Sequence, residues 1–204
     1  MKGLIICGYP GVGKSSIAGW NNCIDLESSL FSHYGPEDSC RKSDDKWVRE
    51  YCNLAYYLAL QGYTIMTSTH KAVIDYFNCF KVTYYKDVPI VIFCPRYDMK
   101  KAWAIRLVNR YLNSENKKDL RAFQGAIEDW DKKLDHCFKT GLLVYCPDEI
   151  DYDLRDYILQ IRKKEGCDDE ETNSSLEQMA GVEGSGLDVS VVEESTDTVR
   201  NRSE

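Results

Sequence analysis

The chain has 204 residues, of which 43% are hydrophobic and 12% aromatic, so we expect a domain with a sizeable core. Its net charge of −7 is unevenly distributed: residues 167–204 hold eleven acidic residues against two arginines, a net charge of −9, which leaves about +2 on residues 1–166. This balance lacks the strongly basic character of a typical nucleic-acid binder, and no apolar run approaches the ~18 residues of a membrane span.

The first predicted element is a buried strand over residues 3–7, which runs into the loop GYPGVGKS at residues 8–15. The loop has the pattern G-x-x-x-x-G-K-[ST] of a phosphate-binding loop. Its glycines carry no Cβ, so the backbone can wrap closely around a phosphate group. Residues 16–18 are predicted to open a helix, whose N-terminus would add amide donors for the anion.

Each side chain of this loop has a chemical role in the phosphate-binding pattern. Lys14 places a positive charge on the β- and γ-phosphates, and Ser15 offers its hydroxyl to Mg²⁺. The alternative is a glycine-rich turn that contains Lys-Ser by chance, but the flanking strand and helix favour a nucleotide site. We therefore expect ATP phosphates to contact Gly8, Pro10, Gly11, Val12, Gly13, Lys14, Ser15 and Ser16.

The second predicted strand, residues 22–25, ends in an acidic residue, Asp25. Ligands of open α/β sheets lie at the carboxyl ends of the strands, so we expect Asp25 near the phosphates. There it can take a proton from an acceptor hydroxyl or organise Mg²⁺; the alternative is that it only caps a turn. Glu27, two residues later, is a second candidate.

Between this strand and the next helix lies an aromatic and basic stretch, residues 30–34 followed by Arg41 and Lys42. It predicts either an acceptor pocket or ordinary aromatic packing. A helix with apolar residues at a 3.6-residue period follows Ser43 and ends at Gly62.

The third predicted strand, residues 63–67, is followed by Ser68, Thr69 and His70, and then by a helix over residues 70–80. His70 belongs to the same sheet edge as the phosphate loop, where it either contacts substrate or starts the helix behind a capping hydroxyl. The fourth strand, residues 88–94, is apolar over 90–94, as expected when helices cover both faces of a parallel sheet.

Arginines dominate the segment after the fourth strand. Arg106 and Arg110 are four residues apart and share one helix face. Two guanidinium groups on one face suit a polyphosphate and the charge of a transferring phosphoryl group, although a solvated basic face has the same pattern. Arg96 and Arg121 are further candidates in the same region.

The remaining elements are a long predicted helix over residues 117–139, a fifth strand over 142–146 and a last helix over 151–164. The alternation of strands and helices predicts an α/β fold, a three-layer structure around a parallel five-stranded sheet of the P-loop NTPase type. We assign residues 1–166 to this domain. Residues 167–204 are acidic and contain no aromatic residue, so they are predicted to be a disordered tail.

Nine cysteines are present, but Cys7, Cys94 and Cys146 lie in or beside predicted buried strands and no C-x-x-C pair exists. Free cysteines pack as small hydrophobic residues. This usage favours a reduced, cytoplasmic protein without a membrane segment.

Residues 1–165 resemble the small P-loop kinases of the nucleoside monophosphate kinase type, which include the shikimate and gluconate kinases. The loop is similar to the G-x-P-G-x-G-K variant of adenylate kinases, Asp25 matches the acidic residue that ends the second strand, and Arg106 and Arg110 resemble the arginines of the mobile lid. The Asp-Gly-x-Pro-Arg segment of adenylate kinases is missing after the third strand, where this chain has Thr67-Ser68-Thr69-His70.

The sequence therefore predicts a kinase that uses ATP and Mg²⁺ to phosphorylate a small acceptor, a nucleotide or nucleoside, with Lys14, Asp25, Arg106 and Arg110 in the reaction and Ser15 and Asp25 at the metal. Two alternatives stay open. One is a polynucleotide 5′-kinase; the other is a regulatory ATPase whose acidic tail binds a partner. The acceptor and the roles of Glu27, His70, Arg41 and Lys42 are not fixed by the sequence.

Overall fold

The computed structural model describes residues 2–34 and 40–168, and these residues contain a five-stranded sheet. All neighbouring strands are parallel, in the order β2-β3-β1-β4-β5. The predicted α/β fold with a parallel five-stranded sheet is confirmed, and each strand lies within two residues of its predicted bounds. The strands are β1 (Leu4–Gly8), β2 (Cys23–Asp25), β3 (Thr64–Ser68), β4 (Ile90–Phe93) and β5 (Leu143–Tyr145).

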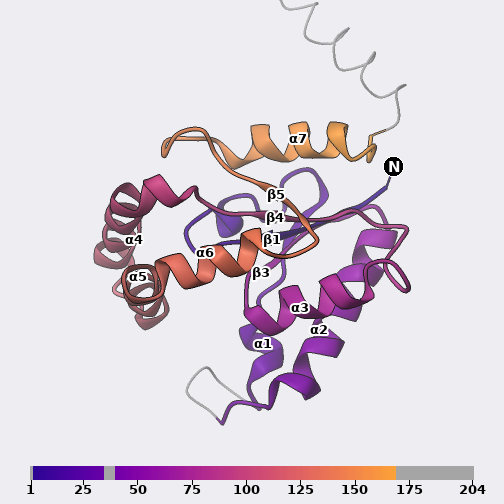
Figure 1. Ribbon diagram of the computed structural model, residues 1–204, viewed down its shortest axis with the longest axis horizontal. Helices are drawn as coiled ribbons and strands as arrows, with labels where there is room; N and C mark the ends of the chain where they lie inside the picture. Colours follow the sequence, from indigo (N-terminus) through magenta and orange to yellow (C-terminus); the bar gives the residue numbers. More distant parts are fainter. Residues whose placement is uncertain (1, 35–39, 169–204) are drawn as a thin grey trace, which may run out of the picture. The chain divides into compact units, whose positions relative to one another are not determined.

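Helices cover both faces of the sheet, with α7 on one side and α2, α3 and α6 on the other (Figure 1). Because of this double cover, every residue of β1 and β4 is buried, which explains the continuous apolar runs in the sequence. The helices are α1 (Ser29–Ser32), α2 (Asp44–Leu60), α3 (Lys71–Phe80), α4 (Lys100–Ser114), α5 (Lys117–Glu128), α6 (Trp130–Phe138) and α7 (Leu154–Lys164).

The helix expected over residues 117–139 is wrong in one respect, because it is two helices that break at Asp129 (φ −116°, ψ 20°). The break lets α5 pack on α4 while α6 turns toward the sheet and buries Trp130 and Leu134. Ile127 at the end of α5 and Phe138 at the end of α6 are 47% and 38% exposed.

The helix expected directly after the phosphate-binding pattern is also wrong. Residues Lys14–Ser16 form a single 3₁₀ turn, followed by a second turn at Trp20–Asn22. Gly19 and Asn21 have φ values of 82° and 44°, and these left-handed residues turn the chain back into β2 before a helix can extend. The loop therefore lacks a following helix N-terminus, and its own amides and side chains are the donors that it offers.

The folded unit extends slightly beyond the predicted boundary at residue 166. Cys167 is buried, and its carbonyl accepts a hydrogen bond from the Lys2 amide at 3.0 Å. Asp168 pairs with Arg162 of α7 at 2.8 Å. Both residues belong to the unit that contains the sheet; the rest of the predicted tail lies outside the described residues.

All nine cysteines are free, and Cys7, Cys94 and Cys146 lie in or directly after β1, β4 and β5, the first two fully buried and the third half-buried. Across the two described ranges, none of the helices has both the length and the apolar character that crossing a membrane requires.

Arg162 is expected to be the most sensitive charged residue for stability. Its side chain is 4% exposed and donates to the Thr64 hydroxyl and the Asp168 carboxylate, both at 2.8 Å. Arg162→Ala leaves these acceptors without their donor, so we expect a loss of about 3 kcal/mol in the free energy of unfolding. Urea denaturation measures this loss, with the exposed Lys163→Ala of the same helix as the control. Equal stability of the two variants would contradict a structural role for the Arg162 network.

Candidate functional site

The loop after β1 has the backbone that its glycines allow. Gly11 and Gly13 have φ values of 89° and 96°, a region that other residues rarely adopt. A Cβ on Gly11 would also lie 2.9 Å from the Leu107 side chain. Both glycines are therefore required by the observed conformation, as the pattern predicts.

Two aromatic side chains hold the loop from outside. The Trp103 indole of α4 donates to the Pro10 carbonyl at 2.9 Å, and the Tyr152 hydroxyl donates to the Val12 carbonyl at 3.0 Å. Their rings stack with centroids 6.4 Å apart. Because these bonds occupy loop carbonyls, they fix the loop without using the amides that an anion would need.

Lys14 lies half-buried over the start of the loop, and its ammonium donates to the Gly8 carbonyl at 2.8 Å. Burial lowers the pKa of Lys14 to about 8, against the opposing effect of the Asp25 and Glu27 carboxylates. An anion that enters the loop would supply the missing countercharge, so its binding favours the protonated form.

For the ATP site that the sequence predicts, this pKa implies that binding depends on pH. Below about pH 8, Lys14 is already protonated in the free protein. Above that pH, Lys14 must take up a proton when ATP binds. The affinity for ATP therefore falls as the pH rises, toward a limit of about tenfold per pH unit. Calorimetric titration with ATP from about pH 7.5 to 9.5 tests this. EDTA is present to bind metal ions, so that their hydrolysis at high pH does not contribute to the profile. Lys14→Arg keeps its charge over this range and is expected to give a flat profile; an equally steep profile in that variant would assign the effect to another group.

Ser15 and Asp25 are brought together, as the sequence predicts. The Ser15 hydroxyl donates to Oδ2 of Asp25 at 2.9 Å, whereas Oδ1 of Asp25 is buried and has no hydrogen-bond partner among the described residues. A carboxylate oxygen with a free lone pair beside a hydroxyl fits Mg²⁺, which is bound through one or two protein oxygens, phosphates and waters. Within the described part of the chain, no cluster of three or more His, Cys, Asp or Glu side chains has metal-binding geometry, so a metal here would depend on the nucleotide.

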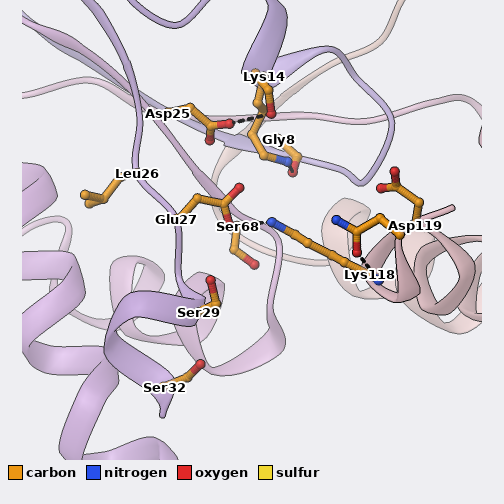
Figure 2. A network of polar contacts seen from close by, with 12 residues as sticks. Gly8, Lys14, Asp25, Leu26, Glu27, Ser29, Ser32, Ser68, Lys118 and Asp119 are labelled. Carbon is orange, nitrogen blue, oxygen red and sulfur yellow. Dashed lines mark hydrogen bonds and ion pairs between the residues drawn. The ribbon is translucent and has the colours of Figure 1, made fainter. Parts of the chain in front are cut away.

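A cavity of about 650 Å³ opens in front of the loop, and we call it the loop cavity. Lys14, Ser15 and Asp25 form one wall, and α4 and α5 supply the other. Lys118 reaches across from α5, and its ammonium lies 2.6 Å from the Glu27 carboxylate (Figure 2). Lys118 thus links α5 to the segment after β2, a contact that the sequence did not predict.

Arg106 and Arg110 share α4 but lie at different places around the loop. Arg110 lines the loop cavity, and its guanidinium lies 2.5 Å from the Asp119 carboxylate. Arg106 donates to the Ile150 carbonyl at 2.6 Å and lies over the rings of Trp103 and Tyr152. Both arginines line a further cavity of about 720 Å³ between α4 and residues 150–151. Of the two, Arg110 alone lines the loop cavity, as Arg121 also does, and a shared target for the pair stays a prediction.

Asp119 is a candidate that sequence reasoning missed. Its carboxylate is almost fully buried between Arg110 and the Ser114 hydroxyl, which donates at 2.7 Å. Asp119 therefore holds Arg110 in place beside the loop cavity. A signal was present, because Asn116 is the residue before α5 and an acid three positions later is typical of a helix start.

In the stretch after β2, the described aromatic residues pack locally or face solvent, and none of them lines the loop cavity. Leu30 and Tyr34 are 77% and 64% exposed, and Lys42 lies 5.4 Å from the centre of the Tyr34 ring. Phe31 packs edge-on against Tyr51. These contacts agree with the alternative of ordinary aromatic packing, and the acceptor pocket stays a prediction.

His70 lies at the carboxyl end of β3 and lines the loop cavity. Arg41 lies outside that cavity and donates to Nε2 of His70 at 2.8 Å. Because a guanidinium is only a donor, this bond makes Nε2 the acceptor and leaves the proton on Nδ1. Burial lowers the pKa of His70, which keeps the ring neutral. The backbone amide of His70 also donates to the Ser68 hydroxyl at 3.0 Å, as the capping alternative predicts.

A second opening, of about 440 Å³, lies on the other side of the loop. Val12 and Gly13 separate it from the loop cavity, and Arg106, Tyr152 and Arg155 line its far wall. The loop thus has a polar cavity on each side. Comparison of the chain with protein-family models and with curated protein sequences gives no match, so the functional argument depends on this geometry.

Proposed function

We propose that this protein is a phosphotransferase that moves the γ-phosphoryl group of ATP to a small acceptor, a nucleotide or nucleoside, with Mg²⁺ as cofactor. The observation that carries the proposal is the meeting of Lys14, Ser15 and Asp25 at one cavity, although Asp25 comes from a different strand. A glycine-rich turn with no function would not require the second strand to present a carboxylate to its serine.

The two openings beside the loop suit the two halves of ATP. Ligand sites measure about 300–1,000 Å³, and the loop cavity and the second opening fall in this range. Phosphates would occupy the cationic loop cavity. The nucleoside would lie in the second opening, where the Arg106 guanidinium and the Tyr152 ring provide flat surfaces.

Phosphoryl transfer depends mainly on positioning and on stabilisation of charge at the equatorial oxygens. Lys14 and Arg110 supply cationic donors at the loop cavity, and Asp119 keeps the Arg110 fork in place. Ser15 and Asp25 would hold Mg²⁺, which neutralises phosphate charge when bound. Oδ2 of Asp25 accepts a hydrogen bond from the Ser15 hydroxyl. The other carboxylate oxygen, Oδ1, can accept a proton from an acceptor hydroxyl.

A screen with γ-labelled ATP and Mg²⁺ tests the proposal directly. The acceptors are the ribonucleosides, their 5′-monophosphates, small polyols and a 5′-hydroxyl oligonucleotide. We expect transfer to one class of small acceptor. Transfer to the oligonucleotide alone would favour a polynucleotide kinase, and ATP hydrolysis that no acceptor stimulates would favour a regulatory ATPase.

The different partners of the two arginines give a specific expectation. Arg110→Ala should lower kcat about a hundredfold with little change in the KM for ATP, because the group acts at the phosphates. Arg106→Ala should raise the KM for ATP about tenfold and leave kcat within a few-fold, because the group faces the nucleoside opening. Steady-state kinetics with varied ATP separates the two effects. Identical profiles for both variants would contradict the division of roles.

A further inference from the structure

A third cavity, of about 670 Å³, lies on the α3 and α6 side of the loop, and we call it the flanking cavity. It shares Pro10, Ser68 and His70 with the loop cavity. The two cavities therefore meet at the crest of the loop, where the γ-phosphate would lie under the proposed function. A molecule in the flanking cavity would be next to the phosphoryl group without competing for the loop.

Tyr9 gives this cavity a buried hydroxyl that none of the described residues satisfies. The side chain is 1% exposed and lines the flanking cavity, with its ring packed edge-on against Trp103 and Trp130. Its hydroxyl has no hydrogen-bond partner in the described part of the chain. Burial raises the pKa of Tyr9, so the hydroxyl keeps its proton and is a donor for an anion.

His70 provides a second donor at the junction of the two cavities. Its Nε2 accepts from Arg41, so the proton lies on Nδ1, and Nδ1 is buried without a partner among the described residues. His70 is thus a hydrogen-bond donor rather than a base in this arrangement.

The rim of the flanking cavity is cationic. Four lysines line it against two aspartates, Asp129 and Asp135. Two of the lysines have a carboxylate partner nearby: Lys71 pairs with Asp75 of α3, and Lys139 pairs with Asp135. The Asp75 carboxylate also lies 3.2 Å from Nε2 of His136. The other two have no carboxylate partner in residues 2–34 and 40–168: Lys133 donates to the Gly125 carbonyl at 3.1 Å, and Lys132 makes no hydrogen bond or ion pair there.

We propose that the flanking cavity binds the acceptor and selects one that already carries a phosphomonoester, with Lys132, Lys133 and the Tyr9 hydroxyl as its contacts. This inference rests on the proposed function and names its substrate class. In the reaction, an acceptor oxygen forms a bond to the γ-phosphorus, the bond from that phosphorus to the bridging oxygen breaks, and ADP leaves with the electron pair. A proton on the attacking oxygen passes to Asp25 or water.

The test measures binding in the Lys14→Ala variant, in which the loop cavity loses its phosphate contact. Calorimetric titrations use the four ribonucleoside 5′-monophosphates and ribose 5-phosphate, each beside its unphosphorylated counterpart, so that nucleotide and sugar-phosphate sources are distinguished. We expect one phosphorylated compound to bind at least about tenfold more tightly than its counterpart. Lys132→Gln with Lys133→Gln should remove about tenfold of that affinity, and Tyr9→Phe a few-fold. The exposed Lys117→Gln, which lines neither cavity, is the matched control.

Three results would overturn the inference: no preference for phosphorylated compounds, a preference that survives the lysine and tyrosine changes, or the same lysines binding a 5′-hydroxyl oligonucleotide in place of monophosphates. Failure of the proposed function looks different. Monophosphate binding that depends on Lys132 and Lys133 but is never followed by transfer in the wild type would sink the kinase proposal and leave the cavity assignment. Efficient transfer to an unphosphorylated acceptor would support the kinase proposal and overturn the assignment of the flanking cavity.

Discussion

Lys14→Ala is expected to abolish measurable phosphoryl transfer and to weaken ATP binding about a hundredfold. The ammonium lies at the start of the loop, where it donates to the Gly8 carbonyl at 2.8 Å. An anion in the loop would draw it away from that carbonyl, so the charge is available for the phosphates. Label transfer and calorimetric titration measure the two losses separately.

The fold should survive this change. Burial disfavours the charged form of Lys14, so removing it relieves a desolvation cost while losing one hydrogen bond of about 1 kcal/mol. The melting temperature is therefore expected to stay within a few degrees of the wild type. Lys117→Ala, an exposed lysine of α5 outside the cavities, controls for general charge loss. Normal turnover in Lys14→Ala would remove the basis for a phosphate-binding loop.

The sheet could be predicted from the sequence because its strands are continuous apolar runs. β1 and β4 are buried on both faces, so nearly every residue of each strand is apolar and the pattern is visible within the strand itself. The helix break at Asp129 has no such local mark, since α6 turns to bury Trp130 against Tyr9, a residue far away in the chain. No helix follows the loop because Gly19 and Asn21 are left-handed. The sequence does not reveal this, since asparagine is also common in other conformations.

The candidate site divides in the same way. Lys14 and Ser15 follow from a spacing within eight residues, and Asp25 from the rule that strand ends share one sheet edge. Asp119, Lys118 and the loop anchors Trp103 and Tyr152 are set by contacts between helices and loops 90 or more positions apart, or by a pairing with Arg110. No spacing rule predicts such contacts. The shared helix of Arg106 and Arg110 was predictable, whereas their different partners, the Ile150 carbonyl and the Asp119 carboxylate, were not.

Asp25→Asn is expected to lower kcat by about 10²–10⁴-fold while ATP affinity measured without metal stays unchanged or rises slightly. Asparagine keeps the shape and can still accept from the Ser15 hydroxyl, as Oδ2 of Asp25 does at 2.9 Å. It loses the negative charge and, with it, the free lone pair that the buried Oδ1 offers. Both proposed roles, metal organiser and proton acceptor, need that oxygen, so the change isolates the charge.

The dependence of rate on Mg²⁺ separates the two roles of Asp25. If the carboxylate organises the metal, Asp25→Asn should raise the Mg²⁺ concentration for half-maximal rate; if it only accepts the proton, that concentration stays constant and kcat alone falls. Glu27→Gln is the matched control, because Glu27 lines the same cavity but pairs with Lys118 at 2.6 Å, and it should lose less than about tenfold. A loss of that small size in Asp25→Asn itself would reduce Asp25 to a structural partner of Ser15, and the carboxylate of the reaction would have to be Glu27.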